Sequence, residues 1–276
     1  MNKVVAVSGG VDSVVLLDML VGKYGASTII VAHFDHGIRP SSSADAVFVQ
    51  ELAHRYGCIY EGAREELGAS ASEERARDGR YRFLHSVALM YDAQLVTAHH
   101  LDDLVETVVL QNIRGTGWRG LTPFGQDIER PLLDMTKEDI LDYARAHRLA
   151  WREDETNQTL LYARNRIRPA VGALPIDTKR QIHALYTQQW AIRADIDQEV
   201  AKLLETRTSE RYFFIMTPPS EREELLRALT AGRLTRPQLT RLAHAICVAK
   251  PRSTYQAGAG IEVHFTTRTF SVKLIK

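Results

Sequence analysis

The feature that most constrains this chain is residues 4–13, where an apolar run is followed at once by a glycine turn. Residues 4–7 read Val-Val-Ala-Val, which is typical of a buried strand in a parallel sheet. Ser8-Gly9-Gly10 interrupts the run, and apolar residues return from residue 11 to residue 21 with a helix-like face. A strand, a tight turn and a helix start bring backbone N–H groups and the positive end of a helix dipole to one point. The stretch therefore predicts an anion-binding turn.

Phosphate is the anion that this turn suits. Gly9 and Gly10 lack a Cβ, so the backbone can approach phosphate oxygens closely. Ser8 and Ser13 add hydroxyl donors, and Asp12 can cap the helix or help to hold a metal ion. No lysine follows the glycines, so the turn does not have the Walker pattern. The alternative is an ordinary tight turn that contains two glycines.

The composition sets wider limits. A chain of 276 residues, 45% of them hydrophobic, suggests one large domain or two modest ones. The net charge of +1 neither favours nor excludes a nucleic-acid partner, so any basic face must be local. Cys58 and Cys247 form no Cys-x-x-Cys pair, and we expect no zinc or redox site from cysteine. With no apolar run near ~20 residues and a strand starting at Val4, we expect no membrane partner, no signal peptide and a cytoplasmic location.

Strands alternate with helices after the turn, at intervals of roughly 30 residues. The apolar runs that we interpret as further strands are residues 28–32, 58–60, 94–98 and 128–133. This order predicts an α/β fold with a five-stranded, doubly wound parallel sheet of Rossmann-like type. Ligands of such sheets bind beyond the carboxyl ends of the strands, so residues 8–13, 33–39 and 99–103 are expected to meet in one crevice.

A second cluster of polar residues lies at residues 97–107. Asp103 and Glu106 are three residues apart, so both face the same side of a helix, where two carboxylates can receive an ammonium group. His99, at the strand end, can orient a phosphate, a base or a nucleophile. The alternative is a solvated helix N-terminus, where the dipole favours acidic residues in any protein.

These segments carry a resemblance to known enzymes. The turn resembles the PP-loop, Ser-Gly-Gly-x-Asp-Ser, of the N-type ATP pyrophosphatases, which have the adenine nucleotide alpha hydrolase-like fold and split ATP between its α and β phosphates. Several later segments are similar to those of tRNA(Ile)-lysidine synthetases, in the same order over about residues 3–170. They are residues 31–40, residues 71–77 with Arg80-Tyr81, the His-x-x-Asp-Asp-x-x-Glu-Thr segment at 99–107, the turn at 114–117, and residues 154–168.

The resemblance implies a ligase that joins free L-lysine to C2 of cytidine 34 in the CAU anticodon of tRNA(Ile), with ATP and Mg²⁺. The cytidine O2 attacks the α-phosphate of ATP, which gives an adenylated base and pyrophosphate. The ε-amine of lysine then attacks C2 and expels AMP. The product, lysidine, pairs with A rather than with G.

The resemblance also assigns roles to residues. ATP binding falls to Ser8, Gly9, Gly10, Val11, Asp12, Ser13, His33 and Arg80. Asp35 is expected to support adenylation through Mg²⁺ or the base, and Asp12 and Asp35 are the candidate Mg²⁺ ligands. The residues expected around the lysine substrate are Asp103 and Glu106, which hold the ammonium, and His99 and Asp102, which share the same wall.

Basic and aromatic residues are expected to meet the tRNA. They are Arg114, Trp118, Arg119, Arg164, Arg166 and Arg168. Arg80 and Arg114 are expected to contact phosphates of ATP or of the extruded nucleotide, with surface ion pairs as the alternative. Trp118 can stack on the extruded base or can pack within its glycine-rich loop.

We expect three parts along the chain: the PP-loop catalytic domain over residues 1–177, a linker helix within residues 178–210, and a small α+β domain over residues 211–276 that contacts tRNA. The last part is expected to hold a strand at 212–216 and helices near 221–229 and 236–248. Longer members of the family carry a further C-terminal domain, which we do not expect in a chain of this length. The sequence leaves open whether the protein forms a homodimer.

Two other functions stay in consideration. A tRNA base thiolase, or another nucleotide-activating enzyme on the PP-loop scaffold, is the nearer one. Thiolases usually need catalytic or cluster-binding cysteines, and neither Cys58 nor Cys247 falls near the expected crevice. The second is a nucleotide-binding regulator without chemistry, which has little reason to keep both the acidic pair at Asp103 and Glu106 and the basic segment.

Overall fold

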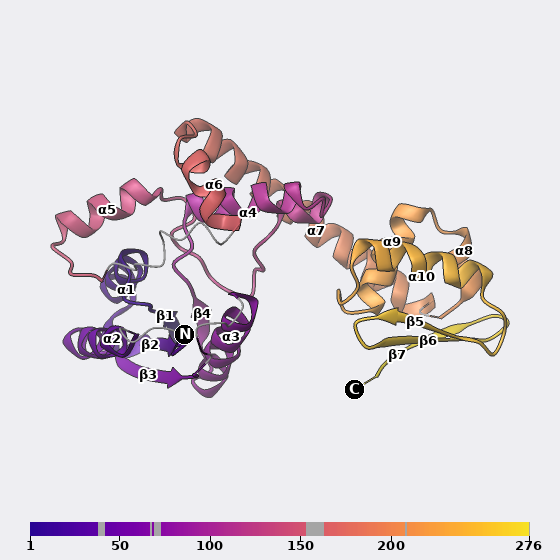
Figure 1. Cartoon of the computed structure of the whole chain (residues 1–276), viewed down its shortest axis with the longest axis horizontal. Helices are drawn as coiled ribbons and strands as arrows, with labels where there is room; N and C mark the ends of the chain where they lie inside the picture. Colours follow the sequence, from indigo (N-terminus) through magenta and orange to yellow (C-terminus); the bar gives the residue numbers. More distant parts are fainter. Residues whose placement is uncertain (38–41, 67, 69–72, 153–162, 208, 276) are drawn as a thin grey trace. The chain divides into compact units, whose positions relative to one another are not determined.

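The structure of the protein is a computed structural model that describes all residues except 38–41, 67, 69–72, 153–162, 208 and 276. Three segments of the family resemblance lie partly in these gaps, around residues 38–40, 71–72 and 154–157. The described chain divides into two compact units, Met1–Thr187 and Gln188–Lys276, each built around its own sheet (Figure 1). The units are described one at a time.

The first unit is built on a parallel sheet of four strands in the order β3-β2-β1-β4. Its strands are β1 (Lys3–Ala6), β2 (Ile29–Asp35), β3 (Ile59–Arg64) and β4 (Gln94–Val96). The α/β parallel fold is confirmed, but the expected count of five strands is wrong. Residues 128–133 contribute only one parallel bridge, between Glu129 and Val96. Pro131 follows that bridge, and because proline has no backbone N–H the pairing cannot continue through it.

Successive residues of the central strands face opposite sides of the sheet. Val5 and Val31 pack among apolar residues of α1 (Val11–Tyr24), α2 (Ser42–Tyr56) and α5 (Lys137–Ala146). Val4 and Ile30 pack on the other side, against α3 (Glu73–Met90). Figure 1 shows α1 and α2 on one side of the strands and α3 on the other. Burial on both faces is the reason that residues 4–7 are uniformly apolar.

Two further helices pack beside the carboxyl end of the sheet. α4 (Leu101–Ile113) follows β4, and α6 (Ala163–Gly172) covers it through Leu101, Val105 and Val171. The basic residues 164–168 are therefore helical. A short 3-10 helix, η2 (Trp118–Leu121), lies between α4 and α5 in the chain, and α7 (Ile176–Arg207) runs from the first unit into the second. Within the described residues, no helix is both long enough and apolar enough to cross a membrane.

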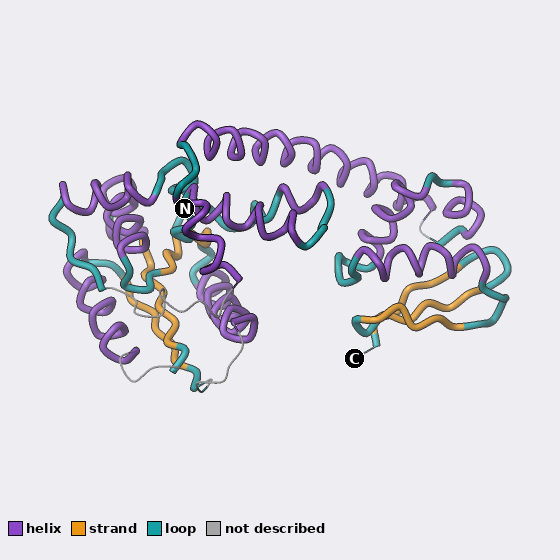
Figure 2. The backbone as a smooth tube through the Cα atoms, turned by 45° about the horizontal axis from the view of Figure 1, so that its top comes forward, coloured by secondary structure: helices purple, strands orange, loops and turns teal. Residues whose placement is uncertain are grey.

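The second unit packs three helices, α8 (Arg211–Met216), α9 (Pro219–Leu229) and α10 (Arg236–Val248), with an antiparallel sheet. The sheet consists of β5 (Thr254–Gly258), β6 (Ile261–Phe265) and β7 (Phe270–Leu274), drawn in orange in Figure 2. The strand expected at residues 212–216 is wrong, because this segment is α8. The helix brings Phe214 to 4.9 Å from the Phe270 ring, so tertiary packing outweighs the strand preference of its aromatic residues.

Arg211 connects several segments of the second unit through buried hydrogen bonds. Its side chain is buried, and its guanidinium donates hydrogen bonds to the Ile246 carbonyl at 2.8 and 3.1 Å. It also donates to the carbonyls of Ala249 at 2.9 Å and Thr266 at 3.1 Å. The positive charge therefore lies at the C-terminal end of α10, where the helix dipole stabilises it and the last carbonyls need donors.

We predict that Arg211→Ala lowers the free energy of unfolding of the second unit by about 3 kcal/mol, because buried carbonyls lose their donors. Hydrogen–deuterium exchange of the β5–β7 amides measures this loss locally. Arg268→Ala is the matched control, since its side chain is exposed. Equal protection in both variants contradicts the role given to Arg211.

Candidate functional site

The turn between β1 and α1 has the geometry of an anion site. Gly9 has a φ of 93°, a conformation that side-chain-bearing residues rarely adopt. The Ser13 hydroxyl donates to the Gly10 carbonyl at 2.9 Å, and the Ser8 N–H donates to the Ser13 oxygen at 3.2 Å. Gly10 is the N-cap of α1, and no described side chain caps this helix end. The turn is thus shaped by its own serines, while the first N–H groups of α1 remain available for an anion.

Two residues, one at the start of α5 and one after its end, contact this turn. The Lys137 ammonium is 2.5 Å from a carboxylate oxygen of Asp12, and the Arg152 N–H donates to the Gly9 carbonyl at 3.0 Å. Lys137 is a site residue that sequence reasoning missed. Thr136 and Asp139 form a capping box that marks a helix start, but nothing local indicates that this start meets Asp12.

Asp35 and His33 lie near the carboxyl end of β2, next to the turn. Asp35 is buried and accepts hydrogen bonds from the Gly37 N–H at 2.9 Å and from Arg64 at 3.0 Å. Burial opposes ionisation of Asp35, but the Gly37 N–H, the Ser42 hydroxyl and the Arg64 charge outweigh it and lower the pKa of the carboxyl. His33 Nδ1 is 2.8 Å from the Val7 carbonyl, so it carries the proton and donates to the strand that leads into the turn.

His99 lies beyond the end of β4, with Nδ1 2.9 Å from the Thr97 hydroxyl and its ring 5.0 Å from Phe124. Burial lowers the pKa of His99, and the positive charges of Arg130, Arg164 and Arg80 lower it further against the opposing charge of Asp103. The imidazole is therefore neutral at pH 7. Arg80 lies on α3 with its guanidinium 5.5 Å from the Tyr81 ring, and burial together with its positive charge also lowers the pKa of His36.

Asp102 joins three helices at the start of α4. One of its oxygens is 2.5 Å from the ammonium of Lys179 on α7, and the other accepts the Lys137 N–H at 2.9 Å. Burial raises the pKa of Asp102, but His100, Lys179 and the Lys137 N–H outweigh burial, and the pKa lies below its ordinary value. His100 and Lys179 are further residues that sequence reasoning missed. Both are buried, and Lys179 is 77 residues away from its partner.

His100 lies between two carboxylates. Its Nδ1 is 3.6 Å from Asp102 and its Nε2 is 3.4 Å from Asp103. Burial favours the neutral ring, but Asp102, Asp103 and Asp12 together raise the pKa of His100. The ring therefore lies between the two carboxylates at the acidic start of α4, and the charge of Asp12 also acts on it.

Asp103 and Glu106 share one face of α4, as expected, and both meet α6. Arg164 Nε is 2.8 Å from one Glu106 oxygen, and Arg168 Nε is 3.1 Å from the other. Arg164 also lies 3.4 Å from Asp103. Burial opposes ionisation of Asp103, but the charges of His100 and Arg164 lower its pKa. Two of the arginines expected to contact tRNA thus contact the two carboxylates expected to hold lysine.

The other residues expected at the tRNA lie apart from this acidic pair. Arg166 is exposed on α6, and Arg114 is exposed at the C-terminal end of α4, about 16 Å along the helix from Asp103. Arg119 lies 4.6 Å from the Trp118 ring in η2, so this ring contacts a cation within its own loop.

Metal ligands are sparse. Among the described residues, no group of three or more His, Cys, Asp or Glu side chains could hold a metal ion. Asp12 and Asp35, the two candidate Mg²⁺ ligands, pair with Lys137 and Arg64. Mg²⁺ commonly takes one or two carboxylates and completes its shell with substrate phosphates and water. The donor set therefore fits a magnesium ion only if a nucleotide supplies further oxygens.

We predict that Asp102→Asn lowers the free energy of unfolding at pH 7 by on the order of 3 kcal/mol, because Lys179 stays buried without its anion. The pKa of Asp102 is lower in the folded state than in the unfolded chain, so ionised Asp102 stabilises the protein at neutral pH. That contribution is lost as the pH falls from about 5, and the variant should show a shallower loss over this range.

Urea unfolding between pH 7 and pH 3 measures both effects of this variant. Asp142→Asn removes a carboxylate whose pair with Arg145 is exposed, and it should change stability by about 0.5 kcal/mol or less. If the curves of stability against pH are parallel for Asp102→Asn and the natural protein, Asp102 does not have the role described here.

Known proteins resemble this chain over most of its first unit. Residues 2–174 match the PP-loop domain family. A tRNA(Ile)-lysidine synthase from Thermus thermophilus is 44% identical over 173 residues, which are 60% of this chain and 34% of that protein. One from Bacillus cereus is 35% identical over 238 residues, 80% of this chain and 49% of that protein. In these matches the chain spans between about a third and a half of the length of its relatives.

A solved structure, the U34-tRNA thiolase NcsA from Methanococcus maripaludis with its [4Fe-4S] cluster, has a TM-score of 0.59 and 16% sequence identity to this chain. The likeness covers 70% of this chain and 72% of that one, and at this identity it indicates a shared fold alone. Because the family match covers well over half of its residues, the chain belongs to the PP-loop domain family.

Proposed function

We propose that this protein is a tRNA(Ile)-lysidine synthase, which joins free L-lysine to C2 of cytidine 34 in the CAU anticodon and consumes ATP. The observation that best supports this proposal is that a site for an anion and a site for a cation follow two neighbouring strands. The anion-binding turn follows β1, and the Asp103–Glu106 pair follows β4, which is the hydrogen-bonded neighbour of β1. An enzyme that activates a base with a phosphate and then brings in an ammonium needs both, side by side.

The turn at Ser8–Ser13 is the proposed ATP site. The N–H groups at the start of α1 face the phosphates, and the absence of a Cβ at Gly9 and Gly10 permits close approach. The cytidine O2 attacks the α-phosphate, and pyrophosphate leaves within the turn. Arg80 is proposed to help neutralise the phosphates, because its charge acts on His36 and His99 near the strand ends. Asp12 and Asp35 are proposed to share Mg²⁺ with the nucleotide, where the ion would neutralise phosphate charge.

Asp103 and Glu106 are the proposed ammonium site. Both carboxylates are already paired with guanidinium groups, so the pocket selects cations. His99 is proposed to belong to the same wall as a neutral ring, which can orient the attacking amine by accepting a hydrogen bond from it. Nitrogen attack at C2 then expels AMP. Asp102 is proposed to hold α4 in place through Lys179 and Lys137.

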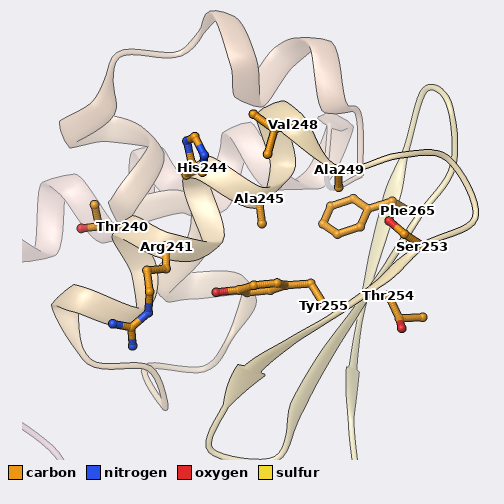
Figure 3. A pocket seen from close by; sticks show the side chains of 10 residues that line it. All are labelled: Thr240, Arg241, His244, Ala245, Val248, Ala249, Ser253, Thr254, Tyr255 and Phe265. Carbon is orange, nitrogen blue, oxygen red and sulfur yellow. The ribbon is translucent and has the colours of Figure 1, made fainter.

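The tRNA is proposed to meet both units of the chain, in the cytoplasm. Arg166, Arg114 and the Trp118–Arg119 pair are the proposed contacts of the first unit. In the second unit, the chain between Glu224 and Glu262 holds six Lys and Arg residues and no Asp or Glu. α10 and β5 line much of an open groove of about 630 Å³ there. Figure 3 shows Arg241, His244 and Tyr255 beside it, side chains suited to phosphate and base contacts.

The test of this function is release of pyrophosphate from ATP with tRNA(Ile) and lysine present. We predict that Asp12→Ala and Ser13→Ala reduce this release at least about 100-fold, because Ser13 shapes the turn and the Asp12 carboxylate holds Lys137 and, as proposed, Mg²⁺ beside the phosphates. Glu138→Gln is the control, since Glu138 is an exposed acid in the first turn of α5, next to Lys137. Near-normal turnover in either loop variant contradicts the ATP site.

A second prediction separates the two chemical steps. Glu106→Gln keeps the size of the side chain and removes its charge, so the lysine concentration needed for half-maximal rate should rise by about one to two orders of magnitude. Adenylation of the tRNA needs no ammonium, and labelled AMP should still accumulate on the RNA when lysine is omitted. Loss of adenylation with an intact lysine step would instead assign Glu106 to the ATP or metal site.

A further inference from the structure

We propose that Arg164 and Arg168 of α6 occupy the lysine site in the tRNA-free protein, and that tRNA phosphates draw them away so that lysine can enter. The proposal rests on the proposed function and concerns the order in which its substrates bind. On this proposal, the protein's own arginines occupy the Asp103–Glu106 pair until tRNA binds.

The contacts provide the first argument. Both oxygens of Glu106 are taken by guanidinium nitrogens, from Arg164 at 2.8 Å and Arg168 at 3.1 Å. Arg164 reaches Asp103 as well, at 3.4 Å, and donates to the Thr107 hydroxyl at 3.2 Å. One guanidinium therefore bridges the same two carboxylates that a substrate ammonium would bridge. A lysine that arrives at this pocket meets a competitor of its own charge.

Exposure supplies the second argument. The Glu106 side chain is 3% exposed, whereas Arg164 is 26% exposed and Arg168 is 43% exposed. The neighbouring pair of Asp102 and Lys179 is different, because its side chains are 12% and 9% exposed. A phosphate in solvent can reach the two arginines but cannot reach Lys179. The arginines are therefore the exchangeable cations of the cluster, and Lys179 is its permanent one.

The charge balance shows why the two ligands help each other. If tRNA drew the arginines away by itself, Glu106 would stay buried without a cation, which is strongly unfavourable. If lysine entered by itself, it would have to displace two tethered guanidinium groups that gain no new partner. With both present, one ammonium bridges Asp103 and Glu106, with His100 remaining 3.4 Å from Asp103, and the two arginines exchange carboxylate for phosphate. Each ion keeps a partner, so binding of tRNA and of lysine should be positively coupled, by the same factor in both directions.

Equilibrium dialysis of labelled L-lysine, without ATP so that no turnover occurs, tests the coupling. For the natural protein, a saturating transcript of tRNA(Ile) with the CAU anticodon should tighten lysine binding about tenfold or more, within the usual range of such couplings. In the double variant Arg164→Gln, Arg168→Gln, lysine should bind the free protein nearly as tightly as it binds the natural protein with tRNA. Addition of tRNA should then change its affinity less than about twofold.

Arg180→Gln is the matched control, because Arg180 is an exposed arginine on α7 next to Lys179 and belongs to none of the proposed ATP, lysine or tRNA contacts. This variant should keep the weak lysine binding of the free protein and its strengthening by tRNA. Should the double variant fail to fold, the reciprocal measurement on the natural protein decides: saturating lysine must tighten tRNA binding by the same factor.

Lysine binding that is equally tight with and without tRNA, and that Glu106→Gln weakens, overturns this inference and leaves the lysine site in place. Absence of lysine binding under every condition, together with no lysine-dependent release of AMP from adenylated tRNA, overturns the proposed function itself. The two failures are therefore distinguishable.

Discussion

The buried contact between Asp102 and Lys179 is the interaction on which the arrangement of the site depends. It lies at the start of α4 and joins that helix to α7, while the second oxygen of Asp102 accepts the first N–H of α5. Lys137, whose N–H makes that bond, uses its ammonium to hold Asp12 beside the anion-binding turn. One carboxylate thus orients three helices around two sites, and because both ions are buried, removal of either would leave a charge without compensation.

How far the sequence predicted this architecture depends on the range of the interactions involved. Residues 4–13 were sufficient for the strand, the turn and the helix, because apolar runs and glycine conformations are local properties. The shared face of Asp103 and Glu106 followed from helix periodicity in the same way. The α/β class followed from alternation along the chain.

The contacts that complete the site lie outside the reach of such patterns. Asp12 and Lys137 are 125 residues apart, Asp102 and Lys179 are 77 apart, and Glu106 and Arg164 are 58 apart. No local spacing indicates which lysine or arginine meets which carboxylate. The fifth strand and the strand at 212–216 failed for a related reason. Pairing at residue 129 stops before Pro131, and packing of Phe214 against Phe270 selects a helix for α8. Both outcomes depend on neighbours that are distant in the chain.

The cations around α4 provide a way to distinguish a structural acid from a ligand-binding acid. A buried, ionised carboxylate needs a cation or hydrogen-bond donors around it, so an internal cation can occupy an ammonium-binding site before its ligand arrives. Pairing by itself therefore cannot separate a structural acid from a ligand-binding one. The exposure of the partner can: Lys179 is enclosed with Asp102, whereas Arg164 and Arg168 reach Glu106 from the solvent side. On this criterion Asp102 maintains the scaffold, and Asp103 and Glu106 are the acids that can exchange their partners.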